Sequence, residues 1–406
     1  MTYSLAMLSA HTSPLDMPGL TREAGGMNVY IRQLAHELGQ SQLRIDIFTR
    51  RTNETSPLIT KLGPNVRVIA VRAGPPLPIH KDELFAYMPA FEQQIEDFRR
   101  REGLNYDLLH SHYWLSGASG MRLALRWRIP HVIMFHTLAH LKQLANPNAP
   151  ELTLRLETER RLIASVDRII ATTPDERMQM IRHCGAAPHA VQVIPCGVDL
   201  HCFTPRDRTE AREQLGWNPD GSILLFAGRL DPFKGPDLLL RTAAMMKTRA
   251  EIVIVGGKAG DPEMTQLHKL ADELKLRRRA HFPGAQTQQQ LALMYCAADV
   301  TVVPSYHESF GLVAVESLAC GTPVVATRAG GLTTIVQHGE TGYLVPRCPG
   351  FFAEKLDTLL QEPDLLDQMR RAARPSVLDY SWTEVARQVR DLYEDALDES
   401  RYLAAQ

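Results

Sequence analysis

The feature that most constrains the fold is a regular alternation of short apolar runs with amphipathic stretches along the chain. The runs are rich in Val, Ile and Leu and lack alternating polar residues, which is typical of parallel strands covered by helices on both faces. The stretches between them have helical period, as where Met27, Tyr30, Ile31, Leu34 and Leu38 fall on one face. We therefore predict an α/β protein whose function resides in strand-to-helix loops. The predicted strands are Tyr3–Ala10, Leu43–Thr49, Val66–Val71, Tyr106–His112, His131–Thr137, Arg168–Thr173, Val191–Pro195, Ser222–Ala227, Glu251–Gly256, Ala280–Pro283, Val300–Pro304 and Pro323–Thr327.

The domain organisation follows from chain length and from one interruption of this pattern. A chain of 406 residues is too long for one typical core, so two domains are expected. Gly and Pro break the alternation in Pro195–Pro205, which places the predicted boundary after residue 204. The predicted domains are therefore 1–204 and 205–380. A last amphipathic helix over 381–406 opens with a capping-box pattern and is followed by no strand.

Composition excludes several classes of partner. The formal net charge of -1 gives no field that would attract nucleic acid or an anionic membrane. No apolar run approaches the roughly 20 residues of a membrane span, and Met1–Ala10 is interpreted as a strand rather than a signal peptide. The six cysteines form no Cys-x-x-Cys pair or zinc spacing, which favours reduced thiols and a cytoplasmic protein. A homo-oligomer remains open.

The most informative loops lie in the second half. In Gly228–Gly235, Arg229 and Lys234 follow a predicted strand and precede a helix, where two cations suit a diphosphate. Either one alone is as easily a solvated surface residue. The segment Pro304–Glu316 also follows a strand, and its carboxylates could accept hydrogen bonds from sugar and ribose hydroxyls. The later Gly330-Gly331 pair is interpreted as a helix-entry turn.

The loops of the first half carry less specific patterns. Gly25-Gly26 precede a helix whose N-terminal N–H groups suit an anion, although a plain glycine turn fits equally well. The pattern is not Gly-x-Gly-x-x-Gly, so a dinucleotide site is poorly supported. His136 stands at the carboxyl end of a predicted strand beside Thr137. The chain has no Gly-x-Ser-x-Gly motif and no Asp-x-Asp motif that would hold a metal on a diphosphate, which predicts chemistry without a metal cofactor.

Together these segments resemble a known family. Glu308–Glu316 resembles the Glu-x7-Glu motif of the retaining glycosyltransferases of family four, which have the GT-B fold. The resemblance extends along the chain through several further segments, which are Gly25-Gly26, His110–Trp114, Phe135–Thr137, Gly197–Asp199, Gly228–Leu230, Lys234-Gly235 and Ala319–Val325. It implies two Rossmann-like domains facing a central cleft, with the last helix crossing back to the first domain. The first domain would bind the acceptor and the second a UDP-sugar or other NDP-sugar.

The resemblance also implies an acceptor class. Gly25–Asn28, His110–Trp114 and Phe135–Thr137 resemble the inositol-phosphate glycosyltransferases of mycothiol synthesis. Sucrose-phosphate synthases are similar but usually carry Gly-Gly-Gln at the first of these segments. Both groups use a phosphorylated acceptor, inositol phosphate or fructose 6-phosphate, and would transfer a hexosyl group of glucose or N-acetylglucosamine type. The matching acceptor-site residues are Gly25, Gly26, Asn28, Lys81, Tyr113, Thr137 and Arg155.

The remaining roles are carried over in the same way. The implied catalytic residues are His136, Arg229, Lys234 and Glu308. The implied donor-site residues are Gly26, Arg229, Lys234, Glu308, Ser309, Phe310, Gly311, Leu312 and Glu316. Alternatives that the sequence leaves open are a transferase acting on a lipid or neutral saccharide, a sugar-nucleotide epimerase of the same fold, a phosphorylase and a non-catalytic sugar-nucleotide sensor.

Overall fold

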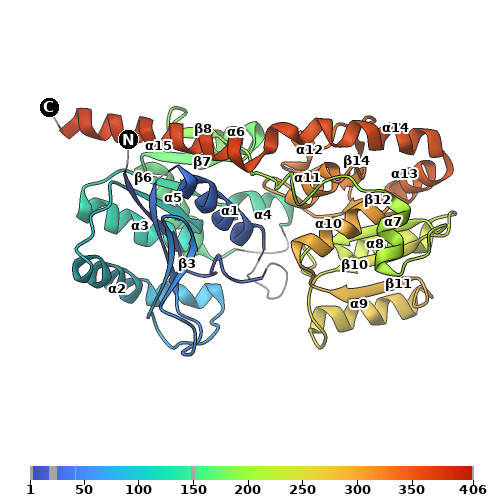
Figure 1. Cartoon of the computed structure of the whole chain (residues 1–406), viewed down its shortest axis with the longest axis horizontal. Coiled ribbons are helices and arrows are strands. Elements are labelled where there is room, and N and C mark those ends of the chain that lie inside the picture. Colours follow the sequence, from blue (N-terminus) through green and yellow to red (C-terminus); the bar gives the residue numbers. More distant parts are fainter. Residues whose placement is uncertain (1–2, 18–24, 42, 148–150, 405–406) are drawn as a thin grey trace. The chain divides into compact units, whose positions relative to one another are not determined.

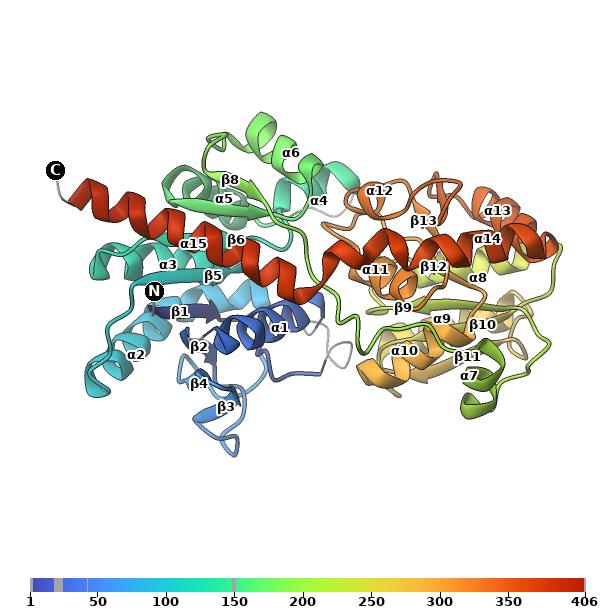
Figure 2. The same cartoon turned by 45° about the horizontal axis from the view of Figure 1, so that its top comes forward.

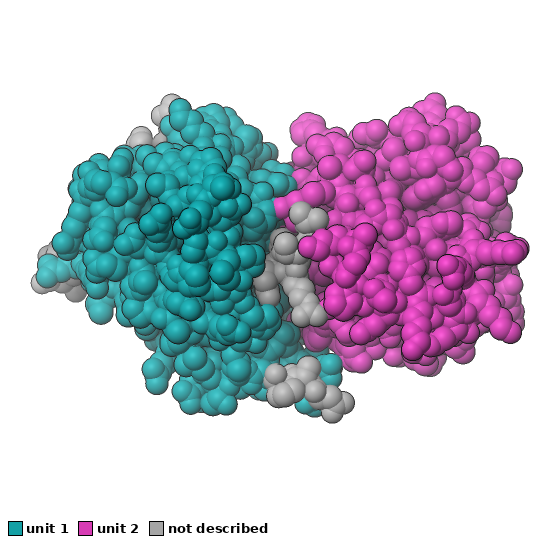
Figure 3. Space-filling view, turned by 90° about the horizontal axis from the view of Figure 1, so that it is seen from below, with its two compact units in different colours: residues 1–16, 26–195, 382–406 teal, residues 17–25, 196–381 magenta. Residues whose placement is uncertain are grey.

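The computed structural model describes residues 3–17, 25–41, 43–147 and 151–404. Figure 3 shows the two compact units into which the chain divides. Unit 1 comprises residues 1–16, 26–195 and 382–406, and unit 2 comprises residues 17–25 and 196–381. Within the described ranges, every helix is too short or too polar to cross a bilayer.

Unit 1 is built on a sheet of order β3-β4-β2-β1-β5-β6-β7-β8 over the described residues, parallel throughout except for the β3–β4 pair. Figures 1 and 2 show α1 beside α15 on one face, with α2, α3 and α5 on the other. The strands are β1 (Ser4–Ser9), β2 (Arg44–Arg50), β3 (Ile59–Gly63), β4 (Val66–Val71), β5 (Leu108–His112), β6 (His131–Met134), β7 (Arg168–Ala171) and β8 (Val191–Val193). The helices are α1 (Gly26–Gln40), η1 (Lys81–Tyr87), α2 (Met88–Arg101), α3 (Tyr113–Trp127), α4 (Ala139–Ala145), α5 (Thr153–Ser165), α6 (Pro174–Cys184) and α15 (Trp382–Ala404).

The last helix, α15, belongs to unit 1 although its sequence follows unit 2. The Trp382 ring lies edge-on to Tyr30 of α1, with 5.5 Å between ring centroids. Further along, the Tyr393 hydroxyl lies 2.6 Å from His110 Nδ1 of β5. The apolar stripe of this helix therefore completes the core of the first unit, as the family resemblance implied.

Unit 2 contains a parallel sheet of order β11-β10-β9-β12-β13-β14 in the described part of the chain. The strands are β9 (Ile223–Ala227), β10 (Glu251–Val255), β11 (Ala280–Gly284), β12 (Val300–Val303), β13 (Val324–Thr327) and β14 (Gly342–Val345). The helices are α7 (Arg208–Leu215), α8 (Pro236–Met245), α9 (Pro262–Glu273), α10 (Gln288–Ala297), α11 (Leu312–Ala319), α12 (Leu332–Ile335), α13 (Pro349–Gln361), α14 (Pro363–Ala373) and η2 (Pro375–Tyr380). The strand order reverses between β9 and β12, as it does between β1 and β5 in unit 1. Such reversal points are where open α/β sheets bind ligands.

The boundary between the units differs from the predicted one. The chain divides between Pro195 and Cys196, ahead of the expected division after residue 204. The intervening residues are built into unit 2, because Val198 N donates to the carbonyl of Tyr380 at 2.7 Å and the Phe203 ring packs on Tyr295. Gly and Pro in this segment therefore shape a connection that is already part of the second unit.

Two strands were not predicted. β3 is a sheet-edge strand that pairs antiparallel with β4, and none of its residues is buried, so it lacks an apolar run. β14 is a four-residue strand at the edge of the second sheet. Both strands are short and lack the continuous apolar run on which a strand prediction depends.

One buried carboxylate organises the end of the second sheet. Asp299, between α10 and β12, is 4% exposed. Its Oδ1 accepts from Arg208 at 2.6 Å and from Arg370 at 2.8 Å. Its Oδ2 accepts from Arg212 and from the backbone N–H of Ile223, both at 2.8 Å. The Arg212 side chain is only 3% exposed, so its charge depends on this partner.

Asp299→Ala is expected to lower the melting temperature of unit 2 by several degrees. The substitution leaves the buried Arg212 without its counter-charge, and removing one partner of a buried ion pair costs about 3–5 kcal/mol. Differential scanning calorimetry measures the shift. Asp398→Ala on α15, whose side chain is 74% exposed, is the control and should change little. Equal melting temperatures for the two variants would contradict the structural role of Asp299.

Candidate active site

The centre of the candidate donor site is an ion pair between two loops of unit 2. Lys234, between β9 and α8, places its Nζ 2.7 Å from both carboxylate oxygens of Glu308, which follows β12. Ser305 also donates its hydroxyl to Glu308 Oε1 at 2.7 Å. Burial alone would raise the pKa of Glu308, but the attraction of Lys234 outweighs it and the pKa lies below its ordinary value. The predicted catalytic residues Lys234 and Glu308 therefore form an ion pair.

A glycine pair holds the backbone of Glu308 in place. Gly331 N donates to the Glu308 carbonyl at 2.7 Å, and a β-carbon at Gly330 would collide with that same oxygen. Gly330 also has φ of +51°, a conformation that favours glycine. The pair does precede α12, as predicted from sequence, but it also lets the chain approach Glu308 closely.

The other donor-site candidates of unit 2 lie in the loops after β9 and β12 or at the start of α11. Arg229 is half-buried in the loop that follows β9, and Ser309 is half-buried just after Glu308. Phe310 is buried, Gly311 caps α11 with φ of 110°, and Leu312 is the first helical residue. The N-terminus of α11 thus directs backbone N–H groups toward the end of β12, a common anion site. These residues come from the two strands at the reversal point of the sheet.

Glu316 lies one to two turns into α11 and is 8% exposed. The Tyr295 hydroxyl of α10 donates to its Oε2 at 3.1 Å. Burial raises the pKa of Glu316 to about 7, against the smaller lowering effect of this hydrogen bond. The predicted ribose ligand Glu316 is therefore a carboxyl group that gains and loses its proton near neutral pH.

His136, the remaining catalytic candidate, belongs to unit 1. It follows β6 and has φ of +58°, a left-handed conformation that is uncommon outside glycine. Its Nε2 lies 3.0 Å from Nδ1 of His112, and its ring packs edge-on against Tyr30. Burial lowers the pKa of His136 to about 3. Its imidazole is therefore neutral at physiological pH and suited to hydrogen bonding rather than to acid catalysis.

Two further histidines connect His136 to the last helix. His110 and His112 lie on one face of β5 with ring centroids 4.2 Å apart, and burial lowers the pKa of both. Tyr393 of α15 contacts His110, so polar side chains run from α15 to His136. Sequence reasoning did not assign these histidines a role. Their spacing of two in a strand was the available signal, because alternate strand residues share a face.

The candidate acceptor site centres on Arg155 of α5, which is 2% exposed. Its Nη2 donates to the carbonyl oxygen of Thr137 at 2.8 Å and to the Thr137 hydroxyl at 3.2 Å, and its guanidinium lies 4.9 Å from the Tyr113 ring centre. Its Nη1 and Nε donate to Glu151 and Glu159 at 2.8 and 2.7 Å. The structure thus joins three of the predicted acceptor residues, and adds two carboxylates that were not predicted. Their positions four residues before and after Arg155 were the available signal.

The other predicted acceptor residues have different settings. The side-chain amide of Asn28 donates to the Thr12 hydroxyl at 2.6 Å, which fastens the loop after β1 to α1. Lys81 is half-buried at the first residue of η1. Gly26 begins α1 and is exposed, whereas the preceding Gly25 is assigned to unit 2. The Asn28 side chain therefore holds the loop after β1 against α1, a role that the sequence did not indicate.

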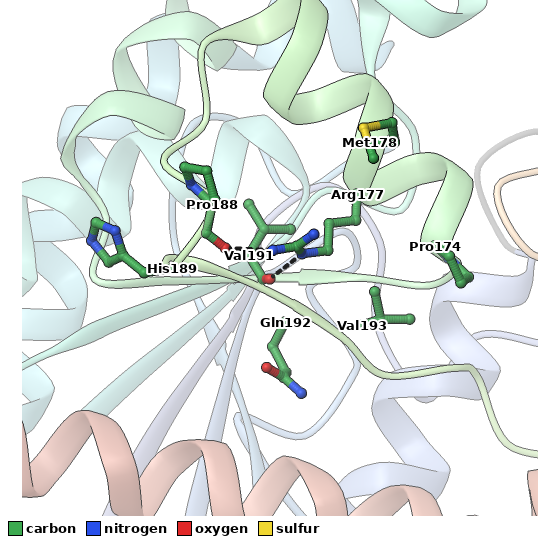
Figure 4. Close-up of a pocket in the computed structure, with 8 residues that line it drawn as sticks. All are labelled: Pro174, Arg177, Met178, Pro188, His189, Val191, Gln192 and Val193. Atoms are coloured by element: carbon green, nitrogen blue, oxygen red, sulfur yellow. Dashed lines mark hydrogen bonds between the residues drawn. The ribbon is translucent and has the colours of Figure 1, made fainter.

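A surface pocket of unit 1 lies apart from these residues. Figure 4 shows it between α6 and β8, with Arg177 donating to the carbonyl oxygens of Val191 and Pro188 at 2.9 and 2.8 Å. The guanidinium thus fastens α6 to β8. None of the predicted site residues lines this pocket.

Comparison with known proteins accounts for both units. The sequence pattern described as Glycosyltransferase Family 4 matches residues 24–202, and that described as Glycosyl transferases group 1 matches residues 207–376. A D-inositol 3-phosphate glycosyltransferase of Streptomyces bingchenggensis is 43% identical over 410 residues, covering 97% of this chain and 89% of the relative. The chain belongs to glycosyltransferase family 4.

Solved structures agree with this assignment. A sucrose-phosphate synthase from Thermosynechococcus elongatus is 33% identical and superposes over the full length of both chains with a TM-score of 0.92. The Anabaena HepE protein in complex with UDP and glucose is 20% identical, covers 97% of this chain and 100% of its own, and has a TM-score of 0.78, which shows the shared fold. This glycosyltransferase therefore has the GT-B fold, and the predicted family and fold are confirmed.

Glu316→Gln is expected to remove a pH-dependent loss of stability from the unliganded glycosyltransferase. The folded-state pKa of about 7 exceeds the ordinary value of 4.5. The resulting stabilisation is complete below pH 4.5 and is lost as the pH rises through 7. Melting temperatures of variant and wild type should be similar at pH 5, with the variant several degrees higher at pH 8. Glu273→Gln, at a side chain 59% exposed, is the control. A difference independent of pH would contradict the raised pKa.

Proposed function

We propose that this glycosyltransferase transfers a hexosyl group, of glucose or N-acetylglucosamine type, to a hydroxyl of a small phosphorylated acceptor with retention of configuration. The donor is a UDP-sugar or another NDP-sugar. The observation that carries the proposal is the meeting of Tyr113, Thr137 and Arg155 at the carboxyl ends of β5 and β6. A guanidinium and two hydroxyls are groups that bind phosphate oxygens through charge-assisted and neutral hydrogen bonds. Lys81 is the fourth proposed phosphate ligand.

Inositol phosphate is the first candidate acceptor. The curated relatives at about 40% identity are named D-inositol 3-phosphate glycosyltransferases, and they match nearly the whole chain. Fructose 6-phosphate is the second candidate, because a sucrose-phosphate synthase at 33% identity has the same fold over its full length. Both candidates combine a phosphate with several hydroxyl groups.

The donor would lie on the loops of unit 2. Arg229 and the N–H groups at the start of α11 would hold the diphosphate and stabilise the charge that develops on it. Lys234 uses two of its contacts on Glu308 and has a third N–H to direct at the diphosphate. Glu308 would in turn accept from sugar hydroxyls, and Glu316 from the ribose. These cations supply the counter-charge, so we propose that no metal ion is needed.

The reaction exchanges one bond for another at the anomeric carbon. The bond to the diphosphate oxygen breaks and its electron pair stays with the leaving nucleotide. The acceptor hydroxyl oxygen bonds to the same face, and its proton passes to the departing phosphate oxygen. Retention follows because attack and departure share that face. The neutral His136 would orient the hydroxymethyl group of the sugar through its ring or its carbonyl.

The test is product formation from defined substrates in excess EDTA. UDP-glucose and UDP-N-acetylglucosamine are each incubated with inositol phosphate, with fructose 6-phosphate and with both dephosphorylated partners, and products are identified by mass spectrometry. We expect kcat/KM for a phosphorylated acceptor to exceed that of its partner at least about 100-fold, because charge-assisted hydrogen bonds contribute about 1.5–3 kcal/mol each. Equal rates for the partners would refute the phosphate site. Activity restored only by magnesium would refute metal independence, and an isomerised donor without acceptor would indicate an epimerase.

Arg229→Ala and Lys234→Ala should each lower kcat by about 10²–10³-fold at saturating donor. Each removes a group that acts on charge developing in the transition state. Steady-state kinetics with the best acceptor measures the effect. Lys269→Ala, at a side chain 80% exposed on α9, should retain wild-type kcat. Changes of only a few-fold would place the two cations outside the catalytic machinery.

A further inference from the structure

The acceptor cluster contains a carboxylate in the position of an anion ligand. Glu151 Oε2 accepts from Arg155 Nη1 at 2.8 Å, and its Oε1 contacts Lys142 Nζ. The Glu151 side chain is 13% exposed and the Arg155 side chain 3%. One carboxylate therefore bridges two cations at the place where the proposed acceptor phosphate would meet Arg155.

The charges of the four residues joined by the ion pairs described here balance without an acceptor. Lys142 and Arg155 provide two positive charges, which Glu151 and Glu159 offset. A phosphate monoester brings about 1.5 to 2 negative charges at neutral pH. Without Lys81, it would gain little net attraction beside two carboxylates, and it would repel the nearer one. Binding of a phosphate here requires one carboxylate to leave.

The two glutamates differ in how firmly they are held. Glu159 lies within α5, is 3% exposed, and accepts from the backbone N–H of Ala139 at 2.8 Å in addition to Arg155. Glu151 precedes the first residue of α5, and the contacts described above join it to side-chain cations. Among the described residues, the hydrogen bonds of Glu151 come from side chains, whereas moving Glu159 would leave the backbone N–H of Ala139, the first residue of α4, without this acceptor. Glu151 is the carboxylate that can be exchanged.

Electrostatics keeps Glu151 in its charged form. Burial would raise the pKa of this carboxyl, but Arg155 and Lys142 outweigh burial and hold the pKa below its ordinary value. Glu151 thus remains an anion at physiological pH. A neutral substitute at this position would leave the two cations with an excess of positive charge.

We propose that Glu151 occupies the phosphate position of the acceptor site and is displaced by the acceptor phosphate. The proposal rests on the proposed function, in which Arg155 binds that phosphate. Every anion that enters must replace the carboxylate, and this requirement weakens the binding of small anions such as inorganic phosphate. An acceptor with further contacts through its hydroxyl groups still binds. Glu151 thereby determines which phosphorylated compounds occupy the site.

Isothermal titration calorimetry with inorganic phosphate tests the proposal without a reaction. We expect Glu151→Gln to lower the dissociation constant for phosphate at least about 10-fold relative to wild type, because removing one charge leaves the cluster net positive. Glu157→Gln, an exposed position of the same helix, should match wild type. The gain should disappear in the double variant Glu151→Gln with Lys142→Ala. Kinetics should agree, with a lower inhibition constant for phosphate as a competitor of the acceptor.

Other results would overturn the proposal. Unchanged or weaker phosphate binding in Glu151→Gln would show that Glu151 supports Arg155 rather than competing for it. Glu151→Ala is measured in parallel, and melting temperatures establish that each variant is folded. A different result would contradict the proposed function alone: phosphorylated acceptors yield no product, while Glu151→Gln still binds phosphate more tightly than wild type. If the calorimetric prediction fails while product still forms, only the proposed displacement of Glu151 by phosphate is refuted.

Discussion

The structure depends on one topological constraint, which is that both units are built on parallel sheets whose strand order reverses once. Parallel strands place all their carboxyl ends at one edge, and the reversal separates the loops that follow two neighbouring strands. In unit 2 these are the loops after β9 and β12, which carry Lys234 and Glu308. In unit 1 the reversal lies between β1 and β5, and the loops after β5 and the adjacent β6 carry Tyr113, His136 and Thr137. Residues far apart in sequence thus meet because sheet order brings their strands together.

A second principle governs the charges at these edges. Lys234 is paired with Glu308, Arg155 with Glu151 and Glu159, and Lys142 with Glu151. Charges removed from water are costly unless they are compensated, which explains the pairing in the unliganded protein. At the proposed acceptor site, binding of a phosphate would exchange the partner of Arg155. The affinity of that site would then depend on the carboxylate that moves as well as on the cations.

The His136 loop shows how a distant segment supports a site. Its left-handed backbone conformation is unfavourable in isolation, and it persists because Tyr30, His112 and the groups behind them surround the ring. The support reaches α15 through His110 and Tyr393. The last helix therefore supports the candidate site of unit 1 as well as its core.

The sequence by itself determined the fold class, twelve of the strands, the return of the last helix and the family, because apolar periodicity and loop motifs are local signals. It also placed Glu308 in a loop after a strand, and the family resemblance predicted Arg155 as an acceptor-site residue. Only the tertiary structure decided their partners: Gly331 binds the backbone carbonyl of Glu308, and Glu151 accepts a hydrogen bond from Arg155. It also decided that the connection after Pro195 belongs to unit 2. Such pairings depend on strand order, register and burial, which bring together side chains that no local pattern relates.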